Sequence, residues 1–241
     1  MAETGDDEFE IIRRHFAPLA RHPAARDLKD DVALLQQRGD LIVTSDAIVE
    51  GVHFLPDDPL DLVARKALRV NISDIVAKGG APKFYSLMLI WPDNRDADDI
   101  AALVRGLDFD QRFYGLDLLG GDTTRTPGPL TLAITMFGAP HAGTPARVGA
   151  QAGDDVWVTG TIGDGCLGLE ARRGALKGLG SAHVSYLAKR YQLPEPRVGL
   201  ALMVGGVASA SCDVSDGLIA DAGHIASASG VAIEIEAARI P

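Results

Sequence analysis

Apolar residues occur along the chain in two kinds of run that alternate with polar stretches. Residues 60–78 have apolar positions three and four apart, which predicts a helix because one turn takes 3.6 residues, and 92–114 predict a turn followed by another helix. Short apolar runs at 84–90 and 130–137 predict strands, the second of them buried on both faces. Helices and strands therefore interleave, which is typical of an α/β (α+β) fold.

The remaining runs extend this order and suggest two domains. Glycine, alanine and proline are frequent in residues 139–155, so we place an N-terminal domain at 1–138 and a C-terminal domain at 139–241. The C-terminal part yields few strands for its helices, and we expect it to be an incomplete α+β domain. The other predicted helices are 8–20, 164–173, 184–191 and 218–229, and the other predicted strands are 41–43, 116–119, 155–159 and 231–236.

Composition narrows the functional classes. Hydrophobic residues make up 46% of the chain and charged residues 23%, as in a globular protein. The net charge of -10 argues against nucleic acid or an anionic membrane as a partner, and an anionic substrate would need metal ions or placed arginines. Two cysteines give no disulfide framework, and the start of the chain has no apolar leader. We therefore expect a cytoplasmic protein.

Aspartates recur where apolar runs begin or end. Any one of them is explained by a helix cap or an Asx turn, but Asp74 falls within a predicted helix and Asp46 follows a predicted strand. Converging carboxylates repel by several kcal/mol at about 4 Å, and hard divalent ions such as Mg²⁺ remove that repulsion while binding phosphates. The set comprises Asp30, Asp31, Asp46, Asp74, Asp122, Asp213 and Asp216.

Three further features suit a phosphate ligand. The run 118–125 ends in Gly-Gly-Asp-Thr-Thr-Arg, which predicts either a plain capped turn or a turn that offers a carboxylate and backbone N–H groups. Arg125 and Arg147 are either phosphate contacts or solvated surface arginines, and His53 is either a ligand or a core residue. The chain has neither a P-loop nor a kinase-type glycine loop, so any ATP chemistry has to be centred on metal ions.

In chain order, the segments EFEIIRRHF, KDDVALL, VTSDAIVEGVHFLP, ALRVNISDIVAKGGAP, LLGGDTTR, VTGTIGDGCLGL and DVSDGLIADAGHI resemble the thiamine-monophosphate kinase family. The wider superfamily includes aminoimidazole ribonucleotide synthetase. The resemblance implies an N-terminal α/β domain whose sheet pairs with that of a second subunit in a homodimer. It also implies phosphoryl transfer from ATP to thiamine monophosphate, with several Mg²⁺ ions and no nucleic acid or membrane partner.

The resemblance further implies roles for single residues. Asp46 and Asp122 are expected to be catalytic, and His53 is expected to contact thiamine monophosphate. The expected ATP contacts are Gly121, Asp122, Arg147 and Ser215. The expected metal ligands are Asp30, Asp31, Thr44, Ser45, Asp46, Asp74, Asp122, Asp213 and Asp216.

Two departures from the family pattern leave alternatives open. The family's Gly-x-Gly-Asp-Asp reads Asp27-Leu28-Lys29-Asp30-Asp31 here, and a lysine lacks the backbone freedom of glycine. Family members continue past residue 241, with acidic and aromatic thiamine contacts that this chain does not contain. A related ATP-dependent synthetase and a non-catalytic nucleotide-binding module are the alternative functions.

Overall fold

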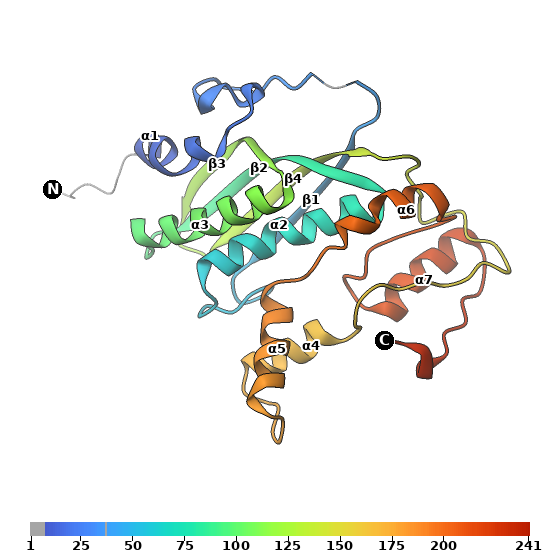
Figure 1. The fold of residues 1–241 in the computed structure, drawn as a ribbon. Helices are drawn as coiled ribbons and strands as arrows, with labels where there is room; N and C mark the ends of the chain where they lie inside the picture. Colours follow the sequence, from blue (N-terminus) through green and yellow to red (C-terminus); the bar gives the residue numbers. More distant parts are fainter. Residues whose placement is uncertain (1–7, 37) are drawn as a thin grey trace. The chain divides into compact units, whose positions relative to one another are not determined.

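A computed structural model describes residues 8–36 and 38–241 of the chain (Figure 1). Its internal contacts divide the chain into two units. The first unit consists of residues 1–72 and 82–139, and the second of residues 73–81 and 140–241. The short segment 73–81 therefore belongs with the C-terminal part of the chain although it lies between two parts of the first unit.

The first unit is built on one four-stranded sheet in the order β1-β4-β2-β3. Strands β1 and β4 are antiparallel, strands β2 and β3 are parallel, and β1 and β3 form the two edges. Helices α2 (Leu60–Ala77) and α3 (Ala97–Tyr114) run across one face of the sheet (Figure 1). The strands are β1 (Ile42–Val49), β2 (Gly80–Pro92), β3 (Asp117–Thr126) and β4 (Thr131–Pro140).

The strands bury one face only. In β4, Leu132, Ile134 and Met136 are fully buried and alternate with half-buried residues. On the other face Val43 and Met88 remain 53% and 44% exposed. The prediction that 130–137 is buried on both faces is therefore wrong, because the helices described in this unit cover a single face of a mixed sheet.

A buried ion cluster joins α2 to α3. The carboxylate of Asp110 is inaccessible to solvent and accepts two hydrogen bonds from Arg69, at 2.6 and 3.1 Å, and one from Arg65 at 3.0 Å. Next to Asp110, Gln111 accepts from the Tyr85 hydroxyl (3.0 Å) and donates to the Leu19 carbonyl (2.7 Å). These contacts fix both helices and the N-terminal segment over the sheet.

The N-terminal segment is more irregular than the predicted helix at 8–20. It consists of α1 (Glu8–Ile11), a π-helix η1 (Ile12–Phe16) and a 3₁₀ helix η2 (Ala17–Leu19). A π turn brings residues five apart onto one side, so Ile11 and Phe16 are buried together while Ile12 is only half-buried.

The following segment, η3 (Pro23–Leu28), contains three consecutive residues with left-handed backbone angles. The φ angles of Arg26, Asp27 and Leu28 are 52°, 57° and 55°. Lys29 has φ -107°, so this position does not use a glycine's freedom. Instead, Asp27 occupies the left-handed region at the position of the family's first glycine.

Two strands extend further than predicted, and two predicted strands are not formed. The predicted strands 41–43 and 116–119 continue as β1 and β3 because the ladders with β4 and β2 run through the polar residues that follow. The segments 155–159 and 231–236 have no strand partner among the described residues, and backbone pairing is what stabilises a strand. Even so, 231–236 alternates between half-buried and exposed side chains.

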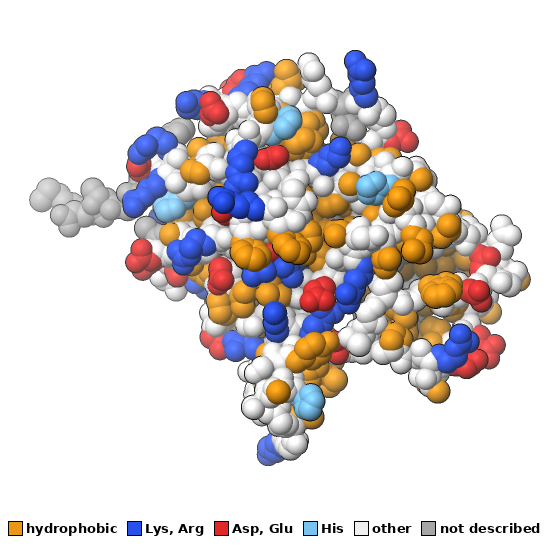
Figure 2. All heavy atoms as spheres, in the orientation of Figure 1, with side chains coloured by type: hydrophobic (Ala, Val, Ile, Leu, Met, Phe, Trp, Pro, Cys, Tyr) orange, Lys and Arg blue, Asp and Glu red, His pale blue; other side chains and the backbone are white. Residues whose placement is uncertain are grey.

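Apart from the ends of β2 and β4, the described residues of the second unit form helices joined by irregular segments, and α7 coincides with the predicted helix 218–229. Helices α4 and α5 pack so closely that a Cβ on Gly168 would lie 2.2 Å from the Leu187 carbonyl oxygen. Helix α6 exposes Leu202, Met203 and Val207, and Figure 2 shows apolar side chains in orange on the surface of the molecule. The helices of the second unit are α4 (Asp164–Arg172), α5 (Ser181–Gln192), η4 (Val198–Leu200), α6 (Ala201–Val207), α7 (Leu218–Ser229) and η5 (Ala237–Arg239).

Among the described residues, no helix combines the length and the apolar character that crossing a membrane requires.

Candidate functional site

Asp46 lies in the middle of β1 and is held against α2 through its backbone. Its N–H donates to Oδ1 of Asn71 (3.1 Å), and Nδ2 of the fully buried Asn71 donates to the Ala67 carbonyl (2.9 Å). Asp46 pairs with buried Ile134, so its side chain is on the helix-covered face of the sheet. The carboxylate is nevertheless exposed because β1 is an edge strand.

The neighbours of Asp46 alternate between the two faces. Thr44 lies on the same face as Asp46, whereas Ser45 lies on the open face, where its hydroxyl contacts the Ile134 carbonyl (3.1 Å) and the Thr135 hydroxyl (3.2 Å). The strand therefore does not direct all three predicted ligands toward one point through their side chains.

His53 is an exposed residue of the loop that follows β1, not a core histidine. Its Nδ1 accepts from the Val49 N–H (3.1 Å), and its carbonyl accepts from Nζ of Lys66 (2.7 Å). Burial lowers the pKa of Lys66 to about 8, and the nearby carboxylate of Asp58 opposes this shift. The imidazole is thus fixed at a surface where a ligand can reach it.

Asp122 occupies a different part of the sheet. The whole run 118–125 is part of β3, so the turn predicted there is not formed. Gly121 approaches β2 so closely that a Cβ would lie 1.8 Å from the Leu87 carbonyl oxygen. The next residue, Asp122, pairs with the exposed Met88 on the open face.

The sheet consequently separates Asp46 from Asp122 within one chain. They are on opposite edge strands with β4 and β2 between them, and three strand spacings amount to roughly 14 Å. Their side chains also point to opposite faces. Two carboxylates bound to one Mg²⁺ lie within a few Å of each other, because Mg–O distances are about 2.1 Å. These two residues therefore do not share an ion within one subunit.

Asp30 and Asp31 lie in the exposed loop after η3. Asp30 forms an ion pair with Arg26 and accepts from the Asp31 N–H (2.8 Å). Both hydrogen bonds, that from Arg26 first, lower the pKa of the Asp30 carboxyl. Arg125, which was predicted to be either a phosphate contact or a surface arginine, is exposed and lies in β3.

The second unit brings together several of the remaining predicted residues around Lys78. Nζ of Lys78 donates to the Ser211 carbonyl, and Oγ of Ser211 donates to the Ala77 carbonyl. The pKa of Lys78 is lowered, mainly by burial, while the charges of Asp213 and Asp74 act to raise it. These half-buried carboxylates therefore lie within electrostatic range of one ammonium group.

Arg147 belongs to the same group of charges. It is exposed, and its positive charge adds to the lowering of the Lys78 pKa. The Ser229 hydroxyl of α7 donates to the Arg147 carbonyl (3.2 Å) and accepts from the Gly149 N–H (3.2 Å). The arginine thus projects from a backbone segment that a helix holds in place.

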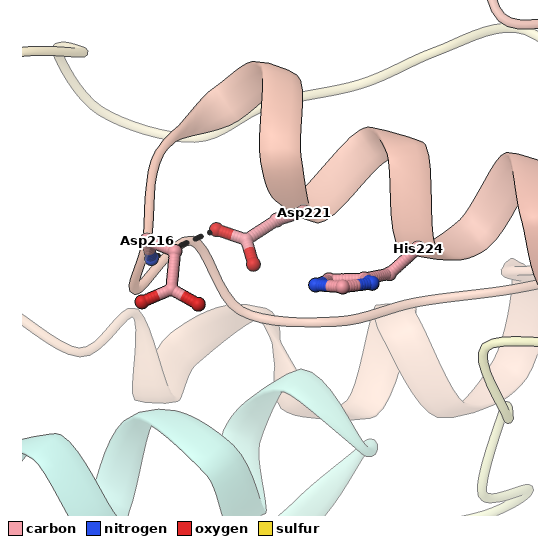
Figure 3. A group of neighbouring side chains, drawn as sticks. All are labelled: Asp216, Asp221 and His224. Carbon is pink, nitrogen blue, oxygen red and sulfur yellow. Dashed lines mark hydrogen bonds between the residues drawn. The ribbon is translucent and has the colours of Figure 1, made fainter.

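Asp216 stands beside a second pair of potential ligands, Asp221 and His224 (Figure 3). One ligand atom from each lies within 4.8 Å of the others. Asp221 is 3% exposed, and its Oδ2 accepts from the backbone N–H groups of Ser215, Asp216 and Gly217 at 3.0–3.1 Å. A single carboxylate oxygen therefore shapes the loop that carries Ser215 and Asp216 just before α7.

Sequence reasoning missed several residues of these groups, among them Asn71, Lys78, Asp221 and His224. Asn71 carries a recognisable signal, because a polar amide among the apolar positions of a helix indicates a specific hydrogen-bond partner. Asp221 sits at the i+4 position after Gly217, in the first turn of α7, where a carboxylate can accept from free N–H groups. Lys78 carried no such signal because its partners come from a distant part of the sequence.

Comparisons with known proteins identify the family to which the chain belongs. The family model "AIR synthase related protein, N-terminal domain" matches residues 29–139, and "AIR synthase related protein, C-terminal domain" matches residues 151–241. The thiamine-monophosphate kinase of Caulobacter vibrioides is 46% identical over 238 residues, covering 97% of this chain and 66% of that protein. The Escherichia coli thiamine-monophosphate kinase is 38% identical, covering 97% of this chain and 73% of that protein.

Solved structures of thiamine-monophosphate kinases are similar to this chain in fold and sequence. The crystal structure of the thiamine-monophosphate kinase of Stenotrophomonas maltophilia matches with a TM-score of 0.78 and 38% identity, covering 90% of this chain and 72% of that one. The structure of AaThiL complexed with AMPPCP and TMP matches with a TM-score of 0.75 and 32% identity, covering 83% of this chain and 64% of that one. The chain thus spans about two thirds of the length of these relatives.

Proposed function

This chain belongs to the thiamine-monophosphate kinase family of the AIR synthase related proteins, and we propose that it transfers the γ-phosphoryl group of ATP to thiamine monophosphate, giving thiamine diphosphate. The observation that carries the proposal is the group around Lys78, where Asp74, Asp213 and Arg147 assemble charges of both signs in one unit. A related structure complexed with AMPPCP, a non-hydrolysable ATP analogue, and TMP supports the two substrates.

Magnesium ions fit the residues present. The donors are carboxylate oxygens, which Mg²⁺ prefers, and the charges of Asp74 and Asp213 act to stabilise a cation at Lys78 against the larger, opposing effect of burial. When bound, Mg²⁺ neutralises charge on the phosphates of the nucleotide. We propose a set of ligands for several magnesium ions, with Ser45 acting through its carbonyl or its open-face hydroxyl. The proposed ligands are Asp30, Asp31, Thr44, Ser45, Asp46, Asp74, Asp122, Asp213 and Asp216.

The reaction requires positioning more than proton transfer. The attacking oxygen belongs to a phosphate monoester that is mostly ionised near pH 7, since its second pKa is about 6, so no general base is required. The barrier is the repulsion between two anions. We assign Arg147, Gly121, Asp122 and Ser215 to holding ATP, and His53 to holding the acceptor phosphate.

We also propose that the active protein is a homodimer in which the sheets of two subunits meet. The observation in support is that Asp46 and Asp122 lie on opposite edges and opposite faces of the sheet. A two-fold axis that brings the β1 edge of one sheet beside the β3 edge of the other would place the strand that carries Asp122 of the partner subunit next to the strand that carries Asp46. The partly exposed Val43 and Met88 suit such an interface.

The direct test is to incubate the chain with Mg·ATP and thiamine monophosphate and to measure thiamine diphosphate by thiochrome fluorescence after separation. We expect product that depends on both substrates and disappears with EDTA. ATP binding by calorimetry without any product would instead identify a nucleotide-binding module. Transfer of ³²P from ATP to a different acceptor, with none to thiamine monophosphate, would identify a related synthetase.

A further inference from the structure

Lys78 is a positive charge built into the group of carboxylates that the proposed function assigns to metal ions. It follows the last residue of α2, and its backbone N–H still donates to the Asp74 carbonyl (3.2 Å). Its side chain turns toward the segment that contains Asp213 and donates to the Ser211 carbonyl. Lys78 therefore connects the two segments that carry the carboxylates.

The surrounding contacts hold this connection firmly. The Ser211 N–H donates to the Ala146 carbonyl (2.9 Å), and its hydroxyl donates to the carbonyls of Ala77 (2.5 Å) and Pro145 (3.3 Å). A Cβ on Gly79, the residue after Lys78, would lie 2.5 Å from the Gly205 Cα, so the backbone is tightly packed on that side as well. The ammonium group is consequently placed by the fold and does not sample the surface freely.

Resting on the proposed function, we propose that Lys78 is a positioning residue that acts as a resident cation: it holds Asp74 and Asp213 together in the metal-free protein and limits how tightly the pair binds divalent ions. The physical reason is that two half-buried carboxylates repel unless positive charge lies near them. Lys78 supplies that charge before any metal arrives, and it remains as a competing charge once the metal is present.

This role predicts two effects of opposite sign for Lys78→Met, which keeps the length of the side chain and removes its charge. Without metal, the variant loses both the counter-charge and the bond to Ser211, so its melting temperature falls. With metal, the carboxylates face one positive charge fewer, so their affinity for a divalent ion rises. Removing one unit charge that lies a few Å from the bound ion, at a dielectric constant near that of water, lowers the dissociation constant roughly fivefold.

The test uses Mn²⁺ alone as the probe, with the nucleotide-free 241-residue chain. The free Mn²⁺ signal in electron paramagnetic resonance gives the dissociation constant for wild type, Lys78→Met and Lys78→Arg, with Lys177→Met as a matched control. Lys177 is an exposed lysine of the same unit. We expect Lys78→Met to bind about fivefold more tightly, and the other variants to bind like wild type. Melting in EDTA should show a loss for Lys78→Met that saturating Mn²⁺ restores.

A merely structural lysine would give the opposite affinity result, because loosening the two segments weakens metal binding. Unchanged or weaker Mn²⁺ binding by Lys78→Met therefore overturns the inference. Thiamine diphosphate formation by the wild-type preparation separates this failure from that of the proposed function. If wild type forms product while Lys78→Met binds Mn²⁺ no more tightly, only the role of Lys78 is wrong. If wild type neither binds Mn²⁺ nor forms product, the proposed function fails as well.

Discussion

The separation of Asp46 from Asp122 leads to a quantitative prediction about how two inactive variants behave together. Each of Asp46→Asn and Asp122→Asn removes a carboxylate charge but keeps the shape of the side chain. We expect each variant alone to lose at least about 100-fold in rate while it remains folded, because the charges of two anionic substrates are then incompletely neutralised. Circular dichroism and melting curves check that both variants fold.

Mixing the two variants should restore part of the activity. If each site takes Asp46 from one subunit and Asp122 from the other, a heterodimer contains one site with both changes and one site with neither. Random reassociation makes about half of the dimers heterodimers, so the mixture should reach about one quarter of the wild-type rate. A heterodimer purified by two different affinity tags should reach about one half.

The assay is thiamine diphosphate formation after subunit exchange under mild denaturant and return to native buffer. A control mixture of two differently tagged Asp46→Asn chains should stay inactive, because every site in it is changed. Purified heterodimer without recovered activity would refute the shared site. So would a chain that remains monomeric in sedimentation experiments at its active concentration.

Three changes test the structural basis of the first unit. Lys66 has a pKa of about 8, below its usual 10.5, because it is buried. Burying the protonated ammonium therefore lowers the free energy of unfolding below pH 8, and this loss disappears as the pH rises to about 10.5. In denaturant titrations over that range, the unfolding free energy of wild type should rise by up to about 3 kcal/mol relative to that of Lys66→Met. A difference that does not change with pH contradicts the burial argument. Asp110→Ala leaves the buried Arg69 and the half-buried Arg65 without their carboxylate. It should lower the unfolding free energy by about 3–5 kcal/mol in urea titrations, and a loss below about 1 kcal/mol contradicts the ion cluster. Gly121→Ala places a methyl group against the Leu87 carbonyl and should lower the unfolding free energy by more than about 2 kcal/mol in the same titrations. Gly120→Ala is the control, because a Cβ there meets nothing within 4 Å. Equal losses of unfolding free energy in the two variants contradict the close approach of Gly121 to β2.

Periodicity located most elements of the fold because it reflects which side of each element is buried. The helices at α2, α3 and α7 fall where apolar spacing predicts them. Strand ends were predicted less well, because a strand continues as long as its backbone pairs with that of the neighbouring strand. The polar run Thr44-Ser45-Asp46 looks like the end of an apolar strand, but the ladder with β4 continues through it. In the same way, the two glycines before Asp122 look like a turn, whereas one of them permits close pairing with β2.

The sequence proposes candidate site residues one by one, but it does not give their spatial grouping. The acidic residues were found because they interrupt apolar runs, a local signal. Sheet order is not local, and it places Asp46 and Asp122 on different edges. Lys78 gave no signal at all, because a lysine at a helix end is ordinary in sequence and acquires meaning only from Ser211, more than a hundred residues away. Long-range partners of this kind follow from the fold, not from the local pattern.

The loop before α7 has a consequence for the proposed contact between Ser215 and ATP. One oxygen of Asp221 gathers three successive amides, so the curve of residues 215–217 is set by the chain itself. Because Asp221 already satisfies these three amides, the loop presents the Ser215 side chain on a backbone that needs no further ordering when a ligand arrives. The association of a nucleotide with this loop is then limited by diffusion, and differences in affinity among nucleotides should appear in their dissociation rates.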